Sequence, residues 1–126
     1  MVVWQGKSKR KKSGSGGRRK RARSKKAYEM GSPAIETFIG PSKTKFKKAR
    51  GHKIKQKILQ AEEINVTDKN GVTKKVKIST FIENKASIDY NRRKIITKGA
   101  ILETELGKIK VTSRPGQIGQ LNGILI

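Results

Sequence analysis

The chain is short, strongly basic and free of cysteine. Its 126 residues include 32 Lys and Arg but only 9 Asp and Glu, a formal net charge of +23, and the length predicts one domain plus extensions. Such a charge repels itself in a compact monomer, and a polyanion, above all a nucleic acid, would relieve the repulsion. The absence of cysteine excludes disulfides and thiolate metal sites, and no apolar run reaches the roughly 18 to 20 residues of a membrane span. We expect an intracellular, soluble protein with no membrane partner, no metal and no cofactor.

The first part of the chain carries most of the charge. Residues 1–60 contain 20 Lys and Arg and 2 acidic residues, whereas residues 61–126 contain 12 and 7. Residues 5–27, QGKSKRKKSGSGGRRKRARSKKA, are rich in glycine and almost free of apolar side chains. They cannot bury enough surface to offset the entropy of ordering. We therefore predict a long basic arm over residues 1–30, disordered when free and extended when bound.

The arm contains the residue types that bind polyanions. Arginine makes forked phosphate contacts and stacks on bases, and glycine lets the backbone run close to a sugar-phosphate chain. Trp4 could stack on a base or pack against the following module. The run RKRARSKK is equally typical of a solvated tail or a nuclear localisation signal.

A basic connecting segment over residues 31–53 leads to a different pattern. From Ile54, short runs rich in Ile and Val alternate with turn residues, which are Asn70-Gly71, Asn84, Gly99, Gly107 and Pro115-Gly116. This spacing is typical of an all-β domain, and no helical periodicity of convincing length is present. We predict a small barrel-like module of short antiparallel strands over residues 54–126. The final run LNGILI would close it, because exposed sheet edges are hazardous.

The first of two predicted hairpins lies in INVTDKNGVTKKVKI. A loop over residues 69–71 puts Gly71 where a left-handed residue is wanted. Asp68 then lies opposite Val72, and Ile64 lies opposite Val76.

The second predicted hairpin lies in AILETELGKIKVT, with a tight loop at Leu106-Gly107. The predicted cross-strand pairs are Glu105 with Lys108, Glu103 with Lys110, Thr104 with Ile109 and Leu102 with Val111. One face is then apolar and the other carries opposite charges, as a half-buried sheet prefers. Pairing with lysines argues against a catalytic dyad of Glu103 and Glu105.

No other arrangement in the sequence supports an enzyme. Ser113 has no base at an arguable position. His52 has no second imidazole or thiolate with which to share a metal, and we interpret it as a loop residue that could touch phosphate. Residues 116–119, GQIG, match a nucleic-acid-clamping loop that requires flanking helices, where strands are predicted here. We predict no catalytic residues and no small-molecule substrate.

A stiffly mounted arginine stands in VTSRPGQIGQ, residues 111–120. Pro115 fixes its own φ and biases Arg114 toward an extended conformation, and Gly116 permits a sharp turn. We interpret this as a mount that presents Arg114 to a fixed phosphate or base edge, with Ser113 and Gln117 as auxiliary donors. The alternative is a turn whose arginine is merely exposed.

Three stretches resemble the S8e family of small-subunit ribosomal proteins of archaea and eukaryotes. They are WQGKSKRKKSGSGGRRKRARSKKAYEMG, ENKASIDYNRRKIITKGA and KIITKGAILETELGKIKVTSRPGQ. The similarity covers nearly the whole chain, and the length, without a large insertion, resembles the archaeal form. The family implies a β-barrel-like module with a basic extension and no catalysis. It also implies small-subunit ribosomal RNA and neighbouring ribosomal proteins as partners.

Three features depart from the family pattern. Ile118 stands where aspartate is expected, Lys85 replaces a usual proline, and residues 14–17, GSGG, lengthen a glycine turn; all three concern local turn geometry. Carried over by position, the resemblance implies a set of RNA-contacting candidates, to which we add charged residues of the predicted loops. They are Trp4, Gln5, Gly6, Lys7, Ser8, Arg10, Lys11, Lys12, Gly14, Gly16, Gly17, Arg18, Arg19, Lys20, Arg21, Arg23, Lys25, Lys26, Tyr28, Arg50, His52, Lys53, Arg92, Arg93, Lys94, Lys98, Ser113, Arg114, Pro115, Gly116 and Gln117.

Two other functions are open at this point. A ribosome-assembly factor of the same fold would bind the same RNA but leave before the subunit matures. A chromatin-type DNA-compacting protein would bind duplex DNA as well as RNA, and charge alone does not distinguish these polyanions.

Overall fold

The structure, a computed structural model, describes residues 2–6, 10, 11, 13–20, 22–49 and 51–126. The chain divides into two compact units, Met1–Ala34 and Ile35–Ile126. The first unit contains β1 (Val3–Trp4), the short 3-10 helix η1 (Ala27–Glu29) and β2 (Met30–Gly31), and β1 pairs with β2 in antiparallel fashion. Of the predicted RNA contacts, Lys7, Ser8, Lys12, Arg21 and Arg50 lie outside the described residues.

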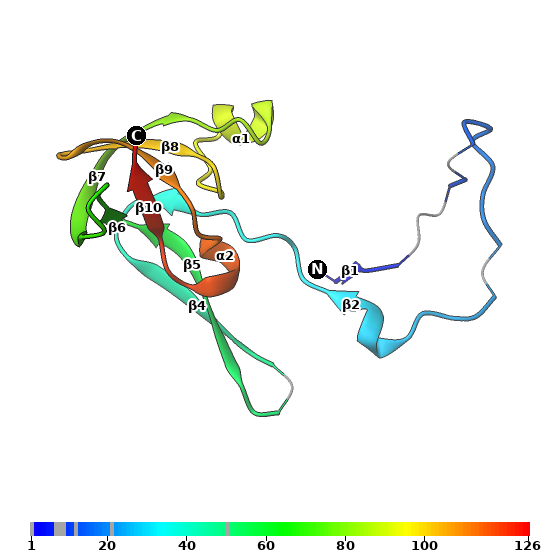
Figure 1. Cartoon of the computed structure of the whole chain (residues 1–126). Helices are drawn as coiled ribbons and strands as arrows, with labels where there is room; N and C mark the ends of the chain where they lie inside the picture. Colours follow the sequence, from blue (N-terminus) through cyan, green and yellow to red (C-terminus); the bar gives the residue numbers. More distant parts are fainter. Residues whose placement is uncertain (1, 7–9, 12, 21, 50) are drawn as a thin grey trace. The chain divides into compact units, whose positions relative to one another are not determined.

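The described part of the second unit contains a closed barrel and a three-stranded sheet (Figure 1). Its elements in chain order are β3 (Phe38–Ile39), β4 (Lys43–Lys48), β5 (Ile54–Ala61), β6 (Glu63–Thr67), β7 (Thr73–Glu83), α1 (Ile88–Arg92), β8 (Ile101–Thr104), β9 (Gly107–Val111), α2 (Pro115–Ile118) and β10 (Asn122–Leu125). The barrel has the strand order β10-β6-β7-β8-β9, and the second sheet has the order β3-β5-β4.

Alternating apolar residues of the barrel strands make the core. Side chains two apart in a strand point to the same face, and this places Ile64 and Val66 of β6 inside the barrel. They meet Leu102 of β8 with Ile109 and Val111 of β9, and none of these five residues is more than 1% exposed. The prediction of a small all-β, barrel-like module is confirmed.

The run LNGILI closes the barrel, as predicted, through β10. This strand is antiparallel to β9 but parallel to β6, so the closing pair departs from the antiparallel pattern of the others. Across that parallel pair, Asn65 Nδ2 donates to Asn122 Oδ1 at 3.0 Å. Gly123 is buried, and a Cβ there would collide with the side chain of Ile109. The strands therefore close tightly only because this residue is glycine.

The first predicted hairpin is confirmed in register. Ile64 of β6 lies opposite Val76 of β7, and the Asp68 amide donates to the Val72 carbonyl at 3.0 Å. Gly71 has a φ of +79°, the left-handed conformation that this loop requires.

The register of the second predicted hairpin is wrong by two residues. Leu102 pairs with Ile109 and Glu103 with Lys108, so the loop is Glu105-Leu106 and Thr104 faces Gly107. Gly107 has a φ of +119° as the first residue of β9, and its carbonyl accepts from Thr104 Oγ1 at 3.1 Å. A slip of two residues leaves every side chain on its own face. The apolar pattern therefore predicted the faces correctly but not the partners.

A long hairpin of β4 and β5 extends away from the barrel (Figure 1). The strand β4 lies within residues 31–53, where the sequence predicted only a connecting segment. The chain before it is held by Thr37, which is fully buried. Thr37 Oγ1 donates to the Ile58 carbonyl at 2.8 Å, and the Thr37 carbonyl accepts from the Ile96 amide at 2.8 Å.

Candidate nucleic-acid interface

The sequence left two roles open for Trp4, stacking on a base or packing against the module; in the structure Trp4 contacts a lysine of its own arm. Lys25 Nζ lies 4.7 Å from the centre of the Trp4 ring, which is a cation–π geometry. Next to the short β1–β2 pair, the Gln5 amide donates to the Glu29 carbonyl at 2.7 Å. These contacts tie the beginning of the arm to its end.

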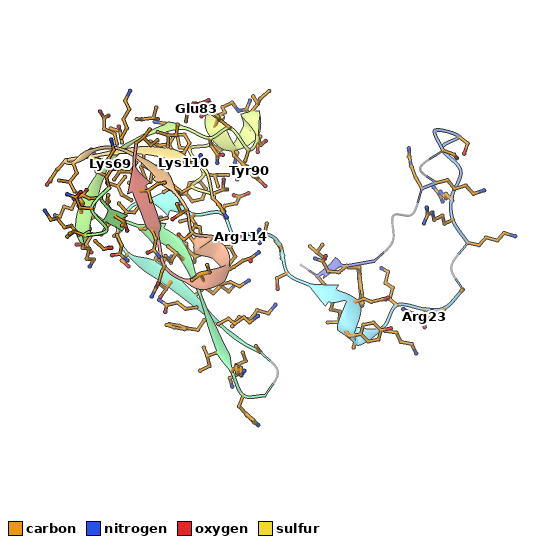
Figure 2. The ribbon with its side chains drawn as sticks, viewed as in Figure 1. Arg23, Lys69, Glu83, Tyr90, Lys110 and Arg114 are labelled. Atoms are coloured by element: carbon orange, nitrogen blue, oxygen red, sulfur yellow. The ribbon has the colours of Figure 1, made fainter. Side chains whose placement is uncertain are left out.

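Arg23 is held by the only acidic residue of the first unit, Glu29. Arg23 Nη2 lies 2.7 Å from Glu29 Oε1 and donates to the Tyr28 hydroxyl at 3.1 Å (Arg23 is labelled in Figure 2). The hydrogen bond to Glu29 raises the pKa of the guanidinium, which is charged in any case. Part of the Arg23 charge is therefore balanced within the arm, where Lys and Arg outnumber the single acidic residue twelve to one.

The middle of the arm turns at its glycines. The Lys11 amide donates to the Gly17 carbonyl at 2.9 Å, and Gly14 and Gly16 both have positive φ. Gly17 is half-buried, and the other predicted contacts in the described part of the arm are exposed. These are Trp4, Gln5, Gly6, Arg10, Lys11, Gly14, Gly16, Arg18, Arg19, Lys20, Arg23, Lys25, Lys26 and Tyr28.

The cluster Arg92-Arg93-Lys94 begins at the last residue of α1 and is positioned by a buried asparagine, Asn84. Asn84 Nδ2 donates to the Ile95 carbonyl at 2.8 Å and to Thr97 Oγ1 at 2.9 Å. The backbone amide of Asn84 donates to Asn91 Oδ1 at 3.1 Å. The helix is thus fixed to the end of β7, and Lys94, with a φ of +54°, turns the chain back toward the barrel.

The three cations of this cluster are not equivalent. Arg93 Nη2 donates to Glu36, and Arg93 Nη1 lies 3.4 Å from Asp89 Oδ2. The hydrogen bond to Glu36, supported by Asp89, raises the pKa of Arg93. Arg92 is more exposed and lies 3.9 Å from Asp89. Arg93 therefore ties α1 to the segment before β3, while Arg92 and Lys94 present their charge to solvent.

Arg114 has the extended backbone that its proline predicts. Its φ is −107° and its ψ is 92°, and Pro115 is the first residue of α2. The side chain is exposed, and Arg114 Nη1 donates to Gln117 Oε1 at 3.4 Å. Figure 2 shows Arg114 beside α2. Pro115 is buried, so it braces this residue from within the module.

Two neighbours of Arg114 have other roles than the sequence suggested. Ser113, predicted as an auxiliary donor, is 7% exposed; its hydroxyl donates to the Gln120 carbonyl at 3.0 Å and accepts from the Asn122 amide at 2.9 Å. Gly116 forms no sharp turn but lies within α2, where a Cβ would be 3.4 Å from the Ile35 Cβ. The left-handed residue that ends α2 is Gly119, with a φ of +78°. Ser113 and Gly116 thus shape the loop that carries Arg114 and Gln117.

The hairpin of β4 and β5 brings His52 and Lys53, which the sequence analysis selected, together with lysines that it did not select. His52 and Lys53 are exposed beside its loop, and Lys98 is exposed in the loop before β8. Lysines of β4 and β5 extend the charge along the hairpin; they are Lys43, Lys45, Lys47, Lys48, Lys55 and Lys57. The signal for them was the alternation of lysine in KTKFKK and KIKQK, a strand-like period without apolar residues at every second place.

Neither a metal-binding cluster nor a membrane-spanning helix is found in the described part of the chain. No group of three or more His, Cys, Asp or Glu there could hold a metal ion. None of the described helices has the length and apolar composition to cross a membrane.

The pattern over the whole chain has a clear match among known families, since the model of ribosomal protein S8e matches residues 4–126. The chain belongs to the ribosomal protein S8e family. Relatives named small ribosomal subunit protein eS8 include that of Methanococcus vannielii, 48% identical over 100% of this chain and 98% of the relative. Those of Methanosphaera stadtmanae and Methanocorpusculum labreanum are 48% and 45% identical, over at least 99% of both chains.

Membership of the S8e family confirms the resemblance drawn from the sequence. It makes the chain a ribosomal protein with a structural role and not an enzyme, as predicted. Two of the three departures that the sequence analysis named lie on the surface. Lys85 is exposed in the turn after Asn84, and Ile118, the last residue of α2, is 60% exposed.

Proposed function

We propose that the chain is a structural constituent of the small ribosomal subunit in the cytoplasm, where it binds and stabilises small-subunit ribosomal RNA. The observation that carries this proposal is the match to the S8e family over residues 4–126. Relatives of the same length that are named small ribosomal subunit proteins support it. Neighbouring ribosomal proteins are the other partners that such a position implies.

The arm is the main electrostatic contact in this proposal. Residues 1–34 contain twelve Lys and Arg and one acidic residue, so the unit cannot balance its own charge. Exposed arm cations such as Arg18, Arg19 and Lys20 are suited to neutralise phosphates, and binding then releases counterions. Because the arm has too few apolar residues to build a core, we expect the RNA to fix its course.

The loops of the second unit provide contacts of defined geometry. Four exposed cations lie at the end of α1 or on loops that buried residues position; they are Arg92, Lys94, Lys98 and Arg114. Because Arg93 is paired with Glu36 and Asp89, it acts mainly inside the protein. Arg114, braced by buried Pro115, is the cation best suited to a forked contact with a phosphate or a base edge.

Sedimentation of ribosomes tests the location. We expect the full chain, carrying an affinity tag, to remain with mature small subunits through a high-salt wash. Its presence in precursor particles alone would identify an assembly factor instead. Equal affinity for duplex DNA and for small-subunit ribosomal RNA in direct competition would identify a DNA-compacting protein.

The salt dependence of RNA binding tests the role of the arm. Replacing Lys11, Arg18, Arg19 and Lys20 together by Gln in the full chain removes four positive charges. If each contacts a phosphate, the slope of log affinity against log salt should become shallower by about 3 to 4. An unchanged slope would remove these four residues from the interface.

A further inference from the structure

The positive charge of the second unit is concentrated in one hairpin. Residues 43–57, which include β4 and the outer part of β5, contain eight Lys and Arg and no acidic residue. All other residues of Ile35–Ile126 together contain twelve basic and eight acidic residues. The rest of the unit is therefore nearly balanced, and the hairpin carries most of its excess charge.

Four of these lysines stand in directly opposed pairs on one face of the hairpin. Lys45 of β4 lies opposite Lys57 of β5, and Lys47 lies opposite Lys55. Residues two apart in a strand share a face and lie roughly 7 Å apart, while opposed residues lie about 5 Å apart. Lys45, Lys47 and Lys55 are exposed and Lys57 is half-buried. We call these four residues the lysine face.

In the barrel, unlike in the hairpin, lysines lie opposite acidic residues. Glu63 lies opposite Lys77 and Glu103 lies opposite Lys108, and Lys77 Nζ is 3.5 Å from Glu62 Oε1. Like charges directly opposite each other destabilise a strand pair, and unlike charges stabilise it. The same chain therefore pairs lysine with glutamate in the barrel and lysine with lysine in the hairpin. Residues 43–57 contain no acidic residue, so a polyanion bound on this face would relieve the repulsion between its lysines.

Protection of an exposed sheet edge is the other physical role for such lysines. Charged side chains on edge strands hinder edge-to-edge aggregation, and β4 is an edge strand. Because β3 pairs with β5 only at Gln60 and Ala61, the outer part of β5 is an edge as well. Edge protection therefore accounts for charged residues on both strands but not for lysine facing lysine. Glutamate at positions 55 and 57 would protect the edge equally well and would stabilise the pair.

The opposite face of the hairpin is turned toward α2 and is not basic in the same way. A Cβ at Gly119, at the end of α2, would meet the side chain and carbonyl of Gln56 at 2.9 Å. Gln56 lies opposite Phe46, and both are on the face away from the lysine face. The lysine face is thus the side of the ribbon that α2 leaves uncovered.

We propose that the lysine face of the β4–β5 hairpin lies along the phosphate backbone of small-subunit ribosomal RNA, as a contact separate from the arm. This inference rests on the proposed function, which supplies the RNA. Lysine is a compact charge on a flexible stem with three donors, so the face recognises phosphates without reading bases. Such a face suits double-stranded RNA, which proteins recognise mostly by shape and by contacts to phosphates and 2′-hydroxyls across its wide, shallow minor groove.

The test compares charge removal at two places in the full chain. One variant replaces Lys45, Lys47, Lys55 and Lys57 by Gln, and the matched control replaces four exposed lysines of the barrel, Lys69, Lys74, Lys108 and Lys110, by Gln. Binding to a small-subunit ribosomal RNA transcript from a methanogenic archaeon is measured over a range of salt concentrations. The slope of log affinity against log salt should become shallower by about 3 in the hairpin variant and by less than about 1 in the control.

A second variant and the arm variant separate the possible failures. Replacing the same four residues by Arg keeps the charge and should retain the slope of the natural chain, with circular dichroism confirming the fold of every variant. Equal changes in the hairpin and barrel variants would overturn the inference, since net charge alone would explain them. If the arm variant loses slope and the hairpin variant does not, the inference fails while the proposed function stands. If the natural chain does not bind the transcript, the proposed function itself fails.

Discussion

The hairpins β8–β9 and β4–β5 have the same antiparallel geometry but depend on different partners. In β8–β9, Leu102 and Ile109 are completely buried, and Glu103 lies opposite Lys108 on the outer face. In the outer part of β4–β5, Phe46 and Ile54 are 64% and 66% exposed, and lysine lies opposite lysine. The first hairpin is stabilised by the barrel to which it belongs. The second has the composition of a surface that is completed by a polyanion.

The largest expected difference between the two hairpins is in core packing. Leu102→Ala should lower the free energy of unfolding by about 2 to 5 kcal/mol, because it leaves a cavity in the barrel. Phe46→Ala, at an exposed position of β4, should change it by less than about 1 kcal/mol. Urea denaturation followed by circular dichroism measures both values. Similar losses would show that the face of the hairpin around Phe46 belongs to the core.

Replacing arginine by lysine should weaken RNA binding more at a rigid position of the chain than at a flexible one. Arg114→Lys keeps the charge but loses the planar fork, and it should weaken binding to ribosomal RNA by roughly 1 to 2 kcal/mol. Arg19→Lys, in the arm, should change the affinity less than about twofold, since a flexible lysine reaches a phosphate equally well. Filter binding with a ribosomal RNA transcript measures both. Equal effects, or none, would mean that Arg114 is only an exposed turn residue.

Reversing one charge in each hairpin should change the free energy of unfolding least, but in opposite directions in the two hairpins. Lys45→Glu places an acid opposite Lys57 and should raise the free energy of unfolding by about 0.2 to 1 kcal/mol. It should also weaken RNA binding. Glu103→Lys creates a like-charge pair with Lys108 and removes the acceptor of Thr80 Oγ1 at 2.9 Å, so it should lower stability. A loss of stability in Lys45→Glu would contradict the idea that repulsion between opposed lysines destabilises the hairpin in the free protein.

The barrel could be predicted because the residues that determine its strands lie close together in the sequence. Alternating Ile and Val define the buried face of each strand, and Gly71 fixes one loop through its conformation. At Leu106, where no residue type fixes the loop conformation, the predicted register was wrong by two residues, although the predicted faces were correct. The parallel pairing of β10 with β6 depends on how the barrel closes, which no short stretch encodes.

The parts that the sequence did not predict depend on distant partners. The strand β4 has no apolar alternation, and it is a strand because it pairs with β5. Arg93 was grouped with its neighbours, but Glu36, far away in the sequence, holds it. Ser113 was predicted to donate to RNA, but its hydroxyl is hydrogen-bonded to the Gln120 carbonyl and the Asn122 backbone amide. Charge counts and family resemblance identified the arm and the Arg92–Lys94 cluster, and tertiary contacts separate the cations bound within the protein from those exposed to solvent.

Lysine reactivity in assembled small subunits, compared with the free chain, tests the central claim most directly. Acylation followed by mass spectrometry reports each lysine separately. The account predicts strong protection of arm lysines such as Lys11 and Lys20 and of Lys45, Lys47 and Lys55 in the hairpin. This protection should be lost after digestion with ribonuclease. Arm and hairpin lysines that react equally in the subunit and in the free chain would contradict RNA binding through these surfaces.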